Sequence, residues 1–539
     1  MATKRIIPTA GTLSDGEPLI GLIELKNNLF LNLTFLLASI LILAPSLGPV
    51  PSANENVYLL YMAQQWDPNL LSKDWTFAGP LPSHWIFNFV FGSLTVIFSL
   101  ETAGWIGRFL SWSLISIALL QLGRHFALPM WMTSLSIFLW LLYGQSPVGG
   151  EWILGTFEAK CIAYIFVFFS LNAFMKGKDF VGSFLLGLSL TFHAVIGMWA
   201  LLAAGLSLIA LRYAPARLLK LAGCMLLGAA PGLIVSLPII SGGWSLSDQE
   251  AKFLALVAAP FHLDPLYFPK RDVFVLFILM GFNWLYFRTE SDSKALRFLN
   301  YFLTFLGLFF LMGVIARVTG QYQFLKYFPL RLFPVLVPLF FFLSLFALCR
   351  NHELSASAVR RLIPVGILAL LCLPNPVGRF IDEAAAHYRM WKTYYDYDNL
   401  QKSFLWVSEK TPRDSTVILP PWRKESFYLS KRATVAHWAT PRMDHFKEWQ
   451  DRVRLLMGDF SQEKEKNIVS KMQDHYNHLA DSEIASMASK YGGDYLISEG
   501  AYSYPILYDT GTYRVYALST SALQASRFLD STRSPISRK

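Results

Sequence analysis

Apolar runs long enough to cross a lipid bilayer recur throughout residues 29–378 and are absent from residues 379–539. A spanning helix needs about 20 apolar residues, because each residue advances it by about 1.5 Å through a hydrocarbon layer about 30 Å thick. The sequence therefore predicts a polytopic α-helical membrane protein with about eleven transmembrane helices, followed by a soluble domain. The candidate spans are residues 29–48, 103–123, 129–146, 161–176, 180–195, 196–212, 218–240, 272–287, 298–316, 332–349 and 362–378.

The overall charge agrees with a chain that lies largely in lipid. Only 16% of the residues are charged, whereas soluble proteins carry about 25%. The net charge of +10 comes largely from short loops between apolar runs, where cations set the orientation of a membrane protein. We therefore expect membrane lipids as surroundings and no nucleic acid as partner. The four cysteines lie in or beside apolar runs without metal-ligand spacing, which indicates small buried residues.

The positive charges also predict an orientation. The run Trp85–Leu100 could span, but it would then place most of the later loop cations outside the cell. A helix lying at the outer surface keeps those cations in the cytoplasm, as the positive-inside rule favours. We expect a cytoplasmic tail at residues 1–28, a transmembrane domain at 29–378 with a long first outer loop at 49–102, and an extracytoplasmic C-terminal domain. The first apolar run begins too far from the N-terminus for a cleavable signal peptide.

The C-terminal part has the alternating pattern of a small α/β domain at residues 379–520. Asp509-Thr510-Gly511 between two short β-type runs predicts a hairpin. No nucleophile motif, glycine-rich phosphate loop or metal spacing is present in this part of the sequence. From residue 521 the Ser- and Arg-rich sequence predicts a disordered tail. The expected helices are Ser403–Glu409 and Ser482–Tyr491, and the expected strands are Val417–Leu419, Thr434–Trp438, Tyr495–Ser498, Ile506–Tyr508 and Tyr513–Ala517.

The first outer loop carries the most suggestive group of polar residues. Glu55 follows the first span closely, and a carboxylate at the membrane surface can act as a general base toward the hydroxyl of an acceptor. Asn54, Asp74 and His84 are candidate substrate-binding residues in the same loop. The structural alternative is that Glu55 stabilises the start of a helix, where carboxylates are favourable.

A second outer segment contains Glu151, Glu158 and Lys160. If residues 149–160 form a helix, the two glutamates share a face, because seven residues make two turns. They could assist catalysis, and Lys160 could bind a phosphate. The alternative is a solvated helix cap with an internal salt bridge, although charges at bilayer depth are costly.

The remaining candidates are two histidines and three cations on the predicted outer side. His193 and His262 could bind substrate, and together with outer carboxylates they could hold a divalent cation. Nothing in their spacing demands a metal, so we predict no defined metal site. Arg317, Lys326 and Arg331 oppose the positive-inside trend, which indicates an anionic ligand such as phosphate or, alternatively, pairing with carboxylates of the soluble domain.

With these segments identified, the chain resembles the GT-C superfamily of membrane glycosyltransferases. Asn54-Glu55-Asn56-Val57-Tyr58 stands where that family has its acidic motif, with Asn54-Glu55 in place of the usual acidic pair, and Glu151 or Glu158 would match its second acidic position. The segments Trp406, 409–417 and 491–497 are similar to outer domains of such proteins. Gly150-Glu151-Trp152 and Glu158-Ala159-Lys160 are closer to an uncharacterised bacterial family of GT-C-like proteins.

The resemblance implies transfer of a sugar from a polyprenyl-phosphate carrier to an unknown acceptor at the outer face of a bacterial plasma membrane. Glu55 would be the general base, assisted by Glu151 or Glu158, and Lys160 with Arg317, Lys326 or Arg331 would neutralise the leaving phosphate. The alternative is a non-catalytic transporter or scaffold with the same fold. Transporters tend to have inverted repeats, and no repeat is visible in this sequence.

Overall fold

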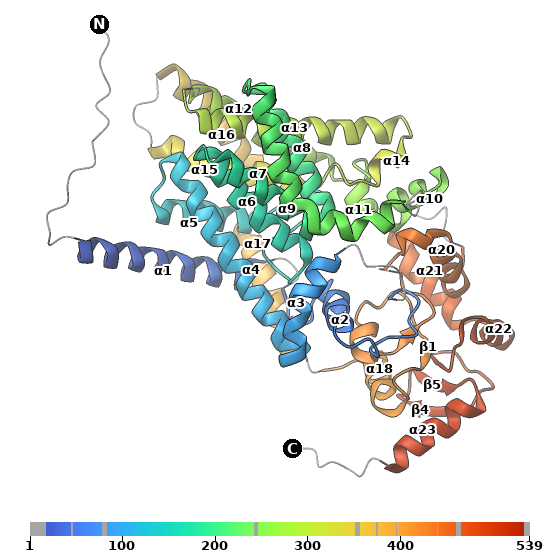
Figure 1. Ribbon diagram of the computed structural model, residues 1–539. Coiled ribbons are helices and arrows are strands. Elements are labelled where there is room, and N and C mark those ends of the chain that lie inside the picture. Colours follow the sequence, from blue (N-terminus) through green and yellow to red (C-terminus); the bar gives the residue numbers. More distant parts are fainter. Residues whose placement is uncertain are drawn as a thin grey trace, which may run out of the picture.

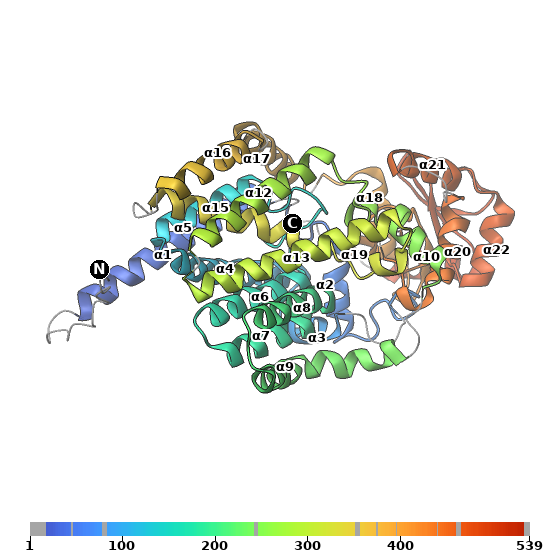
Figure 2. The same ribbon diagram turned by 90° about the horizontal axis from the view of Figure 1, so that it is seen from above.

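A computed structural model describes residues 18–44, 47–77, 84–241, 246–290, 292–350, 356–372, 376–394, 396–438, 440–459 and 465–532. The chain forms a helical bundle and a C-terminal domain with a small sheet, and the domain lies to one side of the bundle (Figures 1 and 2). Most of the predicted cytoplasmic tail, through residue 17, and the last residues of the predicted disordered tail, from 533, lie outside the described residues. So do residues 45–46 and 373–375 of the first and last predicted spans.

Among the described residues, five helices are long and apolar enough to cross a membrane: residues 100–126, 215–236, 270–289, 294–318 and 332–350. Six shorter apolar helices accompany them. Large apolar side chains such as Leu219, Leu227 and Ile315 are exposed on the bundle surface, which is unfavourable in water and favourable in lipid. These features are consistent with a helical membrane protein.

The helices before the C-terminal domain are α1 Pro18–Leu43, α2 Glu55–Gln64, α3 Trp85–Ile97, α4 Leu100–Gly123, η1 Arg124–Phe126, α5 Met130–Leu142, α6 Ala159–Met175, α7 Asp179–Phe192, α8 Ala194–Ala210, α9 Pro215–Ser241, α10 Asp248–Phe253, η2 Leu254–Ala258, α11 Pro260–Leu263, α12 Lys270–Thr289, α13 Lys294–Val318, α14 Tyr322–Leu325, α15 Leu332–Arg350, α16 Ala356–Cys372 and α17 Pro376–Lys392.

Glycines allow α7 and α9 to approach each other closely. A Cβ atom at Gly187 would lie 2.1 Å from the carbonyl oxygen of Met225, and one at Gly228 would lie 2.2 Å from that of Phe184. Both contacts are with backbone, which cannot swing away as a flexible side chain can. Small residues at such crossings are common between membrane helices, because close packing replaces the hydrophobic driving force that lipid removes.

The C-terminal domain is an α/β domain built on a five-stranded sheet of order β2-β1-β3-β5-β4. The pairs β1–β2 and β1–β3 are parallel, and β3–β5 and β4–β5 are antiparallel. The predicted hairpin is thus present as β4 and β5. The elements are α18 Asn399–Lys410, β1 Thr416–Ile418, α19 Ser426–Ser430, β2 Ala433–Thr434, η3 Met443–His445, α20 Phe446–Met457, α21 Glu465–Asn477, α22 Asp481–Tyr491, β3 Tyr495–Ser498, β4 Ile506–Asp509, β5 Arg514–Ala517 and α23 Thr520–Thr532.

The two faces of this sheet bury different sets of side chains, because successive residues of a strand point to opposite sides. Ile418, Leu496 and Tyr516 pack with α20–α22 on one face. Val417 and Ile497 pack with α18 on the other. Helices on both faces make a three-layer domain.

Two elements differ from the sequence prediction in this part of the chain. Residues 520–532, predicted to be mostly disordered, form α23. The hydroxyl of Tyr495 donates to the carbonyl oxygen of Ala522 and also forms a hydrogen bond with the hydroxyl of Ser526. The strand predicted at Thr434–Trp438 is only the two-residue β2, because the chain leaves the sheet edge after Thr434.

The first loop of the bundle holds the C-terminal domain. α2 lies between the bundle and this domain, in contact with α4 of the bundle and α19 of the domain (Figure 1). The backbone N–H of Thr434 donates to Oδ2 of Asp74 at 2.7 Å, and Arg442 donates to the carbonyl of Trp75 at 2.8 Å. Phe77 packs on Phe427 with ring centroids 5.5 Å apart. These contacts tie a loop near the start of the chain to the domain at its end.

The Asp74 contact predicts a dependence of stability on pH. Burial raises the pKa of Asp74 from 3.8 to about 6, and hydrogen bonds from Thr434 and Thr76 only partly oppose this. The folded protein therefore holds the proton more tightly than the unfolded chain, so the free energy of unfolding falls as pH rises from about 4 to about 6. A pKa shift of about two units corresponds to a fall of at most about 3 kcal/mol in the free energy of unfolding.

We expect thermal unfolding midpoints measured from pH 4 to pH 7 to show this fall in the wild-type protein and to lose it in Asp74→Asn. The matched control is Asp67→Asn, since Asp67 lies in the same loop but pairs with Arg413 at the surface. Parallel pH curves for the wild type and Asp74→Asn would show that Asp74 does not titrate in this window.

Candidate functional site

Five buried or partly buried polar residues meet at one end of the helical bundle, and we refer to them as the charged cluster: Glu151, Glu158, Lys160, His262 and Arg331. Lys160 Nζ lies 3.6 Å from a carboxylate oxygen of Glu151 and 3.3 Å from one of Glu158. Arg331 Nε lies 2.8 Å from Oε1 of Glu151. Both glutamates are 2% exposed. Two carboxylates and two cations are thus enclosed together where α6 and α15 begin.

The loop that carries both glutamates is not the helix that we considered from the sequence. It turns at Gly149 and Gly150, whose φ angles of +81° and +59° favour glycine. The amide of Gln145 then fixes it: Oε1 accepts from the N–H groups of Ile153 and Leu154, and Nε2 donates to the carbonyl of Leu154. Glu151 and Glu158 therefore meet through their shared neighbour Lys160 and not by helical spacing.

Glu55, which forms a buried ion pair with Arg108, supports this loop. Arg108 Nε donates to Oε1 of Glu55 at 2.8 Å, and the guanidinium also contacts Oε2. The N–H groups of Phe157 and Ser52 donate to the same carboxylate at 2.6 and 2.9 Å. Glu55 and Arg108 are both 0% exposed. The carboxylate of Glu55 thus has four donors from three parts of the chain, which suits it to holding the loop in place.

Glu151 differs from Glu55 in its hydrogen bonding. Within the part of the chain that the structure describes, Glu151 has ion-pair contacts but no well-directed hydrogen bond: Arg331 Nε lies 2.8 Å from Oε1 without directing its N–H at it, and Lys160 Nζ lies 3.6 Å from Oε2. The buried hydroxyl of Tyr164 also has no partner there, and it lies within electrostatic range of Glu151 and Arg331. Buried polar atoms are rarely left unpaired, so this group is poised to receive a ligand or water.

The protonation states follow from the surroundings. Burial raises the pKa of Glu151, but Arg331, Lys160 and His262 outweigh it, so that the pKa lies below its ordinary value. Burial lowers the pKa of His262 to about 4. Its Nδ1 lies 2.6 Å from the carbonyl oxygen of Gly149, which can only accept, so Nδ1 carries the proton. At neutral pH the charged cluster therefore has two negative and two positive groups and a neutral imidazole.

Three further predicted residues lie near the charged cluster: Asn54 contacts it directly, and His84 and His193 are within electrostatic range of Arg331. Asn54 Nδ2 donates to Glu158 Oε1 at 3.3 Å, and Thr156 donates to the same oxygen at 2.8 Å. The rings of His84 and His193 lie 4.8 Å apart, and His84 also stacks on Tyr58. The sequence thus predicted residues from five separate segments that the fold brings together.

Three other predicted residues lie outside the charged cluster. Asp74 binds the backbone of β2, as described above. Arg317 donates to Asp264 at 2.8 Å, which makes a local ion pair. Lys326 lies over the ring of Tyr327 at 5.3 Å. Neither cation is in contact with Glu151 or Glu158 among the described residues.

Arg108 was missed by the sequence analysis. It is a lone charge inside the apolar run that became α4, and a charged residue in such a run usually has a buried partner. That signal could have paired it with Glu55.

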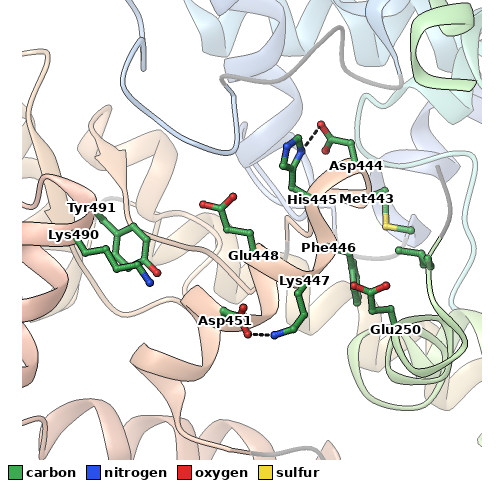
Figure 3. A pocket seen from close by; sticks show the side chains of 11 residues that line it. Glu250, Met443, Asp444, His445, Phe446, Lys447, Glu448, Asp451, Lys490 and Tyr491 are labelled. Carbon is green, nitrogen blue, oxygen red and sulfur yellow. Dashed lines mark hydrogen bonds and ion pairs between the residues drawn. The ribbon is translucent and has the colours of Figure 1, made fainter. Parts of the chain in front are cut away.

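A separate pocket of about 480 Å³ lies on the C-terminal domain, bordered by the α10 segment (Figure 3). Its charged side chains largely pair with each other: His445 Nδ1 is 3.0 Å from Asp444, and Lys447 Nζ is 2.5 Å from Asp451. No residue of the charged cluster lines it. Among the described ranges, no group of three or more His, Cys, Asp or Glu could hold a metal ion.

The chain matches no protein-family model, and no curated protein was found to be similar to it. Its function therefore has to be inferred from the geometry of the charged cluster.

Proposed function

We propose that this protein is a membrane glycosyltransferase of the GT-C type that uses a sugar linked to polyprenyl phosphate. The observation that supports this most is the charged cluster. It combines a buried carboxylate that has no well-directed hydrogen bond among the described residues with a buried lysine and a partly buried arginine, where α6 and α15 begin. Such a site offers a base for an acceptor hydroxyl and positive charge for a phosphate.

The reaction assigns a role to each of these groups. The acceptor oxygen attacks the anomeric carbon of the sugar and loses its proton to Glu151. The bond between the anomeric carbon and the phosphate oxygen breaks, and the electron pair leaves with polyprenyl phosphate. Arg331 and Lys160 stabilise the charge that develops on that phosphate. Glu158 keeps Lys160 oriented through their 3.3 Å contact.

In this proposal Glu55 positions the site instead of acting as its base. Its carboxylate is occupied by Arg108 and two backbone N–H groups, whereas Glu151 has no well-directed hydrogen bond among the described residues. Eleven spans, a cytoplasmic N-terminus and an extracytoplasmic C-terminal domain complete the proposed topology, with shorter helices crossing beside the five long ones.

The proposal predicts that undecaprenyl phosphate stabilises the purified full-length protein in detergent, since a ligand that binds only the folded state raises its stability. Arg331→Ala is expected to abolish the rise in unfolding midpoint relative to its own ligand-free value. Glu151→Gln is expected to keep this rise in midpoint. It is also expected no longer to release undecaprenyl phosphate from any of a panel of undecaprenyl-phosphate-linked hexoses. At a ligand concentration near 100 times Kd, binding raises the free energy of unfolding by about 2.7 kcal/mol.

The matched control is Arg350→Ala, which removes the same charge from the opposite end of α15. Uncharged undecaprenol tests whether the phosphate is required. If undecaprenyl phosphate does not stabilise the wild-type protein, the glycosyltransferase proposal fails, and a non-catalytic transporter or scaffold becomes the better explanation. If Glu151→Gln retains turnover, Glu151 is not the base.

A further inference from the structure

Buried polar atoms without a hydrogen-bond partner, within the ranges that the structure describes, gather where α3 packs on α7. They are Nδ1 of His84, which precedes α3, Oδ1 of Asn88 in α3 and Oγ of Ser189 in α7. Asn88 is 1% exposed and Ser189 is 0% exposed. Native proteins leave few buried polar atoms unpaired. Three of them on two packed helices indicate a place where a ligand supplies the missing partners.

The backbone brings these atoms to a pair of histidines. The N–H of Asn88 donates to the carbonyl oxygen of His84, so these two residues lie one helical turn apart on the same side. The N–H of His193 donates in the same way to the carbonyl oxygen of Ser189. The rings of His84 and His193 join the two elements, with centroids 4.8 Å apart and planes inclined by 35°.

Side-chain contacts connect this histidine pair to the charged cluster through α2. Tyr58 stacks on His84, with ring centroids 5.6 Å apart. The N–H of Tyr58 donates to the carbonyl oxygen of Asn54, and the amide of Asn54 donates to Oε1 of Glu158 at 3.3 Å. A single turn of α2, about 5.4 Å, therefore separates the residue that contacts His84 from the residue that contacts Glu158.

The chemistry of these side chains suits hydroxyl groups. Burial lowers the pKa of His84 to about 4, so its ring is neutral at pH 7. In His193 the N–H of Ile196 donates to Nδ1, so that ring is neutral too, with its proton on Nε2. Asn88 and Ser189 add uncharged groups. The four side chains thus offer donors and acceptors without a full charge, which matches the hydroxyls of a sugar better than a phosphate.

We propose that these side chains form a sugar subsite, which binds the hydroxyl groups of the donor while Arg331 and Lys160 hold its phosphate. This inference rests on the proposed function. The sugar is bonded to the phosphate, so a subsite for its hydroxyls has to lie beside the cations, as the turn of α2 allows. A site built to pair with a hydroxyl rejects ligands that lack it, so the subsite would also select the sugar. The sugar subsite consists of His84, Asn88, Ser189 and His193.

The test titrates the purified full-length protein in detergent with two kinds of ligand that carry the same charge. One is undecaprenyl methyl phosphate, and the other is undecaprenyl phosphate linked to glucose, mannose or galactose. Kd is taken from the rise in unfolding midpoint with ligand concentration. At least one hexose is expected to bind the wild type more tightly than the methyl ester does, and we call this difference the sugar gain.

Ser189→Ala and His84→Phe are each expected to reduce the sugar gain about three- to tenfold, as for loss of one hydrogen bond. Neither variant is expected to change Kd for the methyl ester. Ser189→Ala is expected to keep the ligand-free midpoint, because its hydroxyl has no bond to lose within the described residues. The matched control is Ser207→Ala in the neighbouring α8, where an equally buried hydroxyl already donates to the carbonyl of Ala203 at 2.6 Å.

The outcomes separate this inference from the function on which it rests. If the methyl ester binds but no hexose gives a sugar gain, or if the gain survives in both variants, the subsite is overturned and the proposed function stands. Methyl glycosides of the three hexoses, titrated with the methyl ester present, test the acceptor as the source of the hydroxyls. If they bind the wild type and lose binding in the variants, the assignment to the donor is overturned. If neither lipid binds, both proposals fail.

Discussion

Arg108→Ala is expected to destabilise the protein by about 3–5 kcal/mol, because it leaves a buried carboxylate without its charged partner. Glu55 would keep the N–H groups of Phe157 and Ser52, but these donors carry no full charge. The carbonyl of Gly48 would also lose the bond from Nη1 of Arg108. The measurement is the thermal unfolding midpoint in detergent at a fixed scan rate, since unfolding of membrane proteins is often irreversible.

Two further variants make this test specific to the ion pair. Glu55→Gln combined with Arg108→Met is expected to recover part of the loss, because neutral residues of similar size remove both charges together. Lys447→Ala removes a cation from an exposed pair with Asp451 and is expected to change the midpoint little. Equal midpoints for Arg108→Ala and Lys447→Ala would show that the buried pair contributes no more than a surface pair.

Gly228→Ala is expected to have the second large effect. The added Cβ would lie 2.2 Å from the carbonyl oxygen of Phe184, so α7 and α9 must move apart. Overpacking of this kind costs about 1–3 kcal/mol. It also separates α9 from α7, which in turn packs on α6. The effect should appear as a lower unfolding midpoint and faster proteolysis of the solubilised protein.

Gly223→Ala is the matched control on the same helix. A Cβ atom there meets nothing within 4 Å, and alanine is a better helix former than glycine. The two substitutions are chemically identical, so any difference comes from packing: Gly228→Ala is expected to lower the unfolding midpoint and Gly223→Ala to raise it. A similar loss of stability in both variants would indicate that flexibility of α9, and not its contact with α7, is what the glycines provide.

Local sequence patterns predicted much of the C-terminal domain. β3 was predicted at its exact residues, and α22 within one residue, because the break at Gly492-Gly493-Asp494 and the apolar run after it are local signals. Helix α23 was missed because the packing of Ser526 on Tyr495 depends on tertiary contacts. In the part of the bundle that the structure describes, five helices meet the length and hydropathy that spanning requires. Eleven spans and the GT-C fold stay predictions.

The site was predicted as a set of residues but not as an arrangement. Glu151, Glu158 and Lys160 stood out because charges are rare beside long apolar runs. Their geometry depends on Gln145, a residue with no distinctive sequence context that fixes the loop by three hydrogen bonds. The pairing of Glu55 with Arg108 joins residues 53 positions apart, and no local pattern encodes such a distance. The roles of these residues in catalysis stay predictions.

The contact between Asp74 and Thr434 also has a consequence for biosynthesis. The two residues are 360 positions apart, and a ribosome adding about 5–20 residues per second needs roughly 20–70 seconds to make the intervening chain. During that time the loop that carries Asp74 has already emerged, while the strand that will bind it does not yet exist. The helices of the bundle can assemble first, and this loop acquires its contacts with the C-terminal domain only when that domain has been made. Truncated or stalled chains would therefore expose the loop surface around Asp74 and Phe77 to proteases.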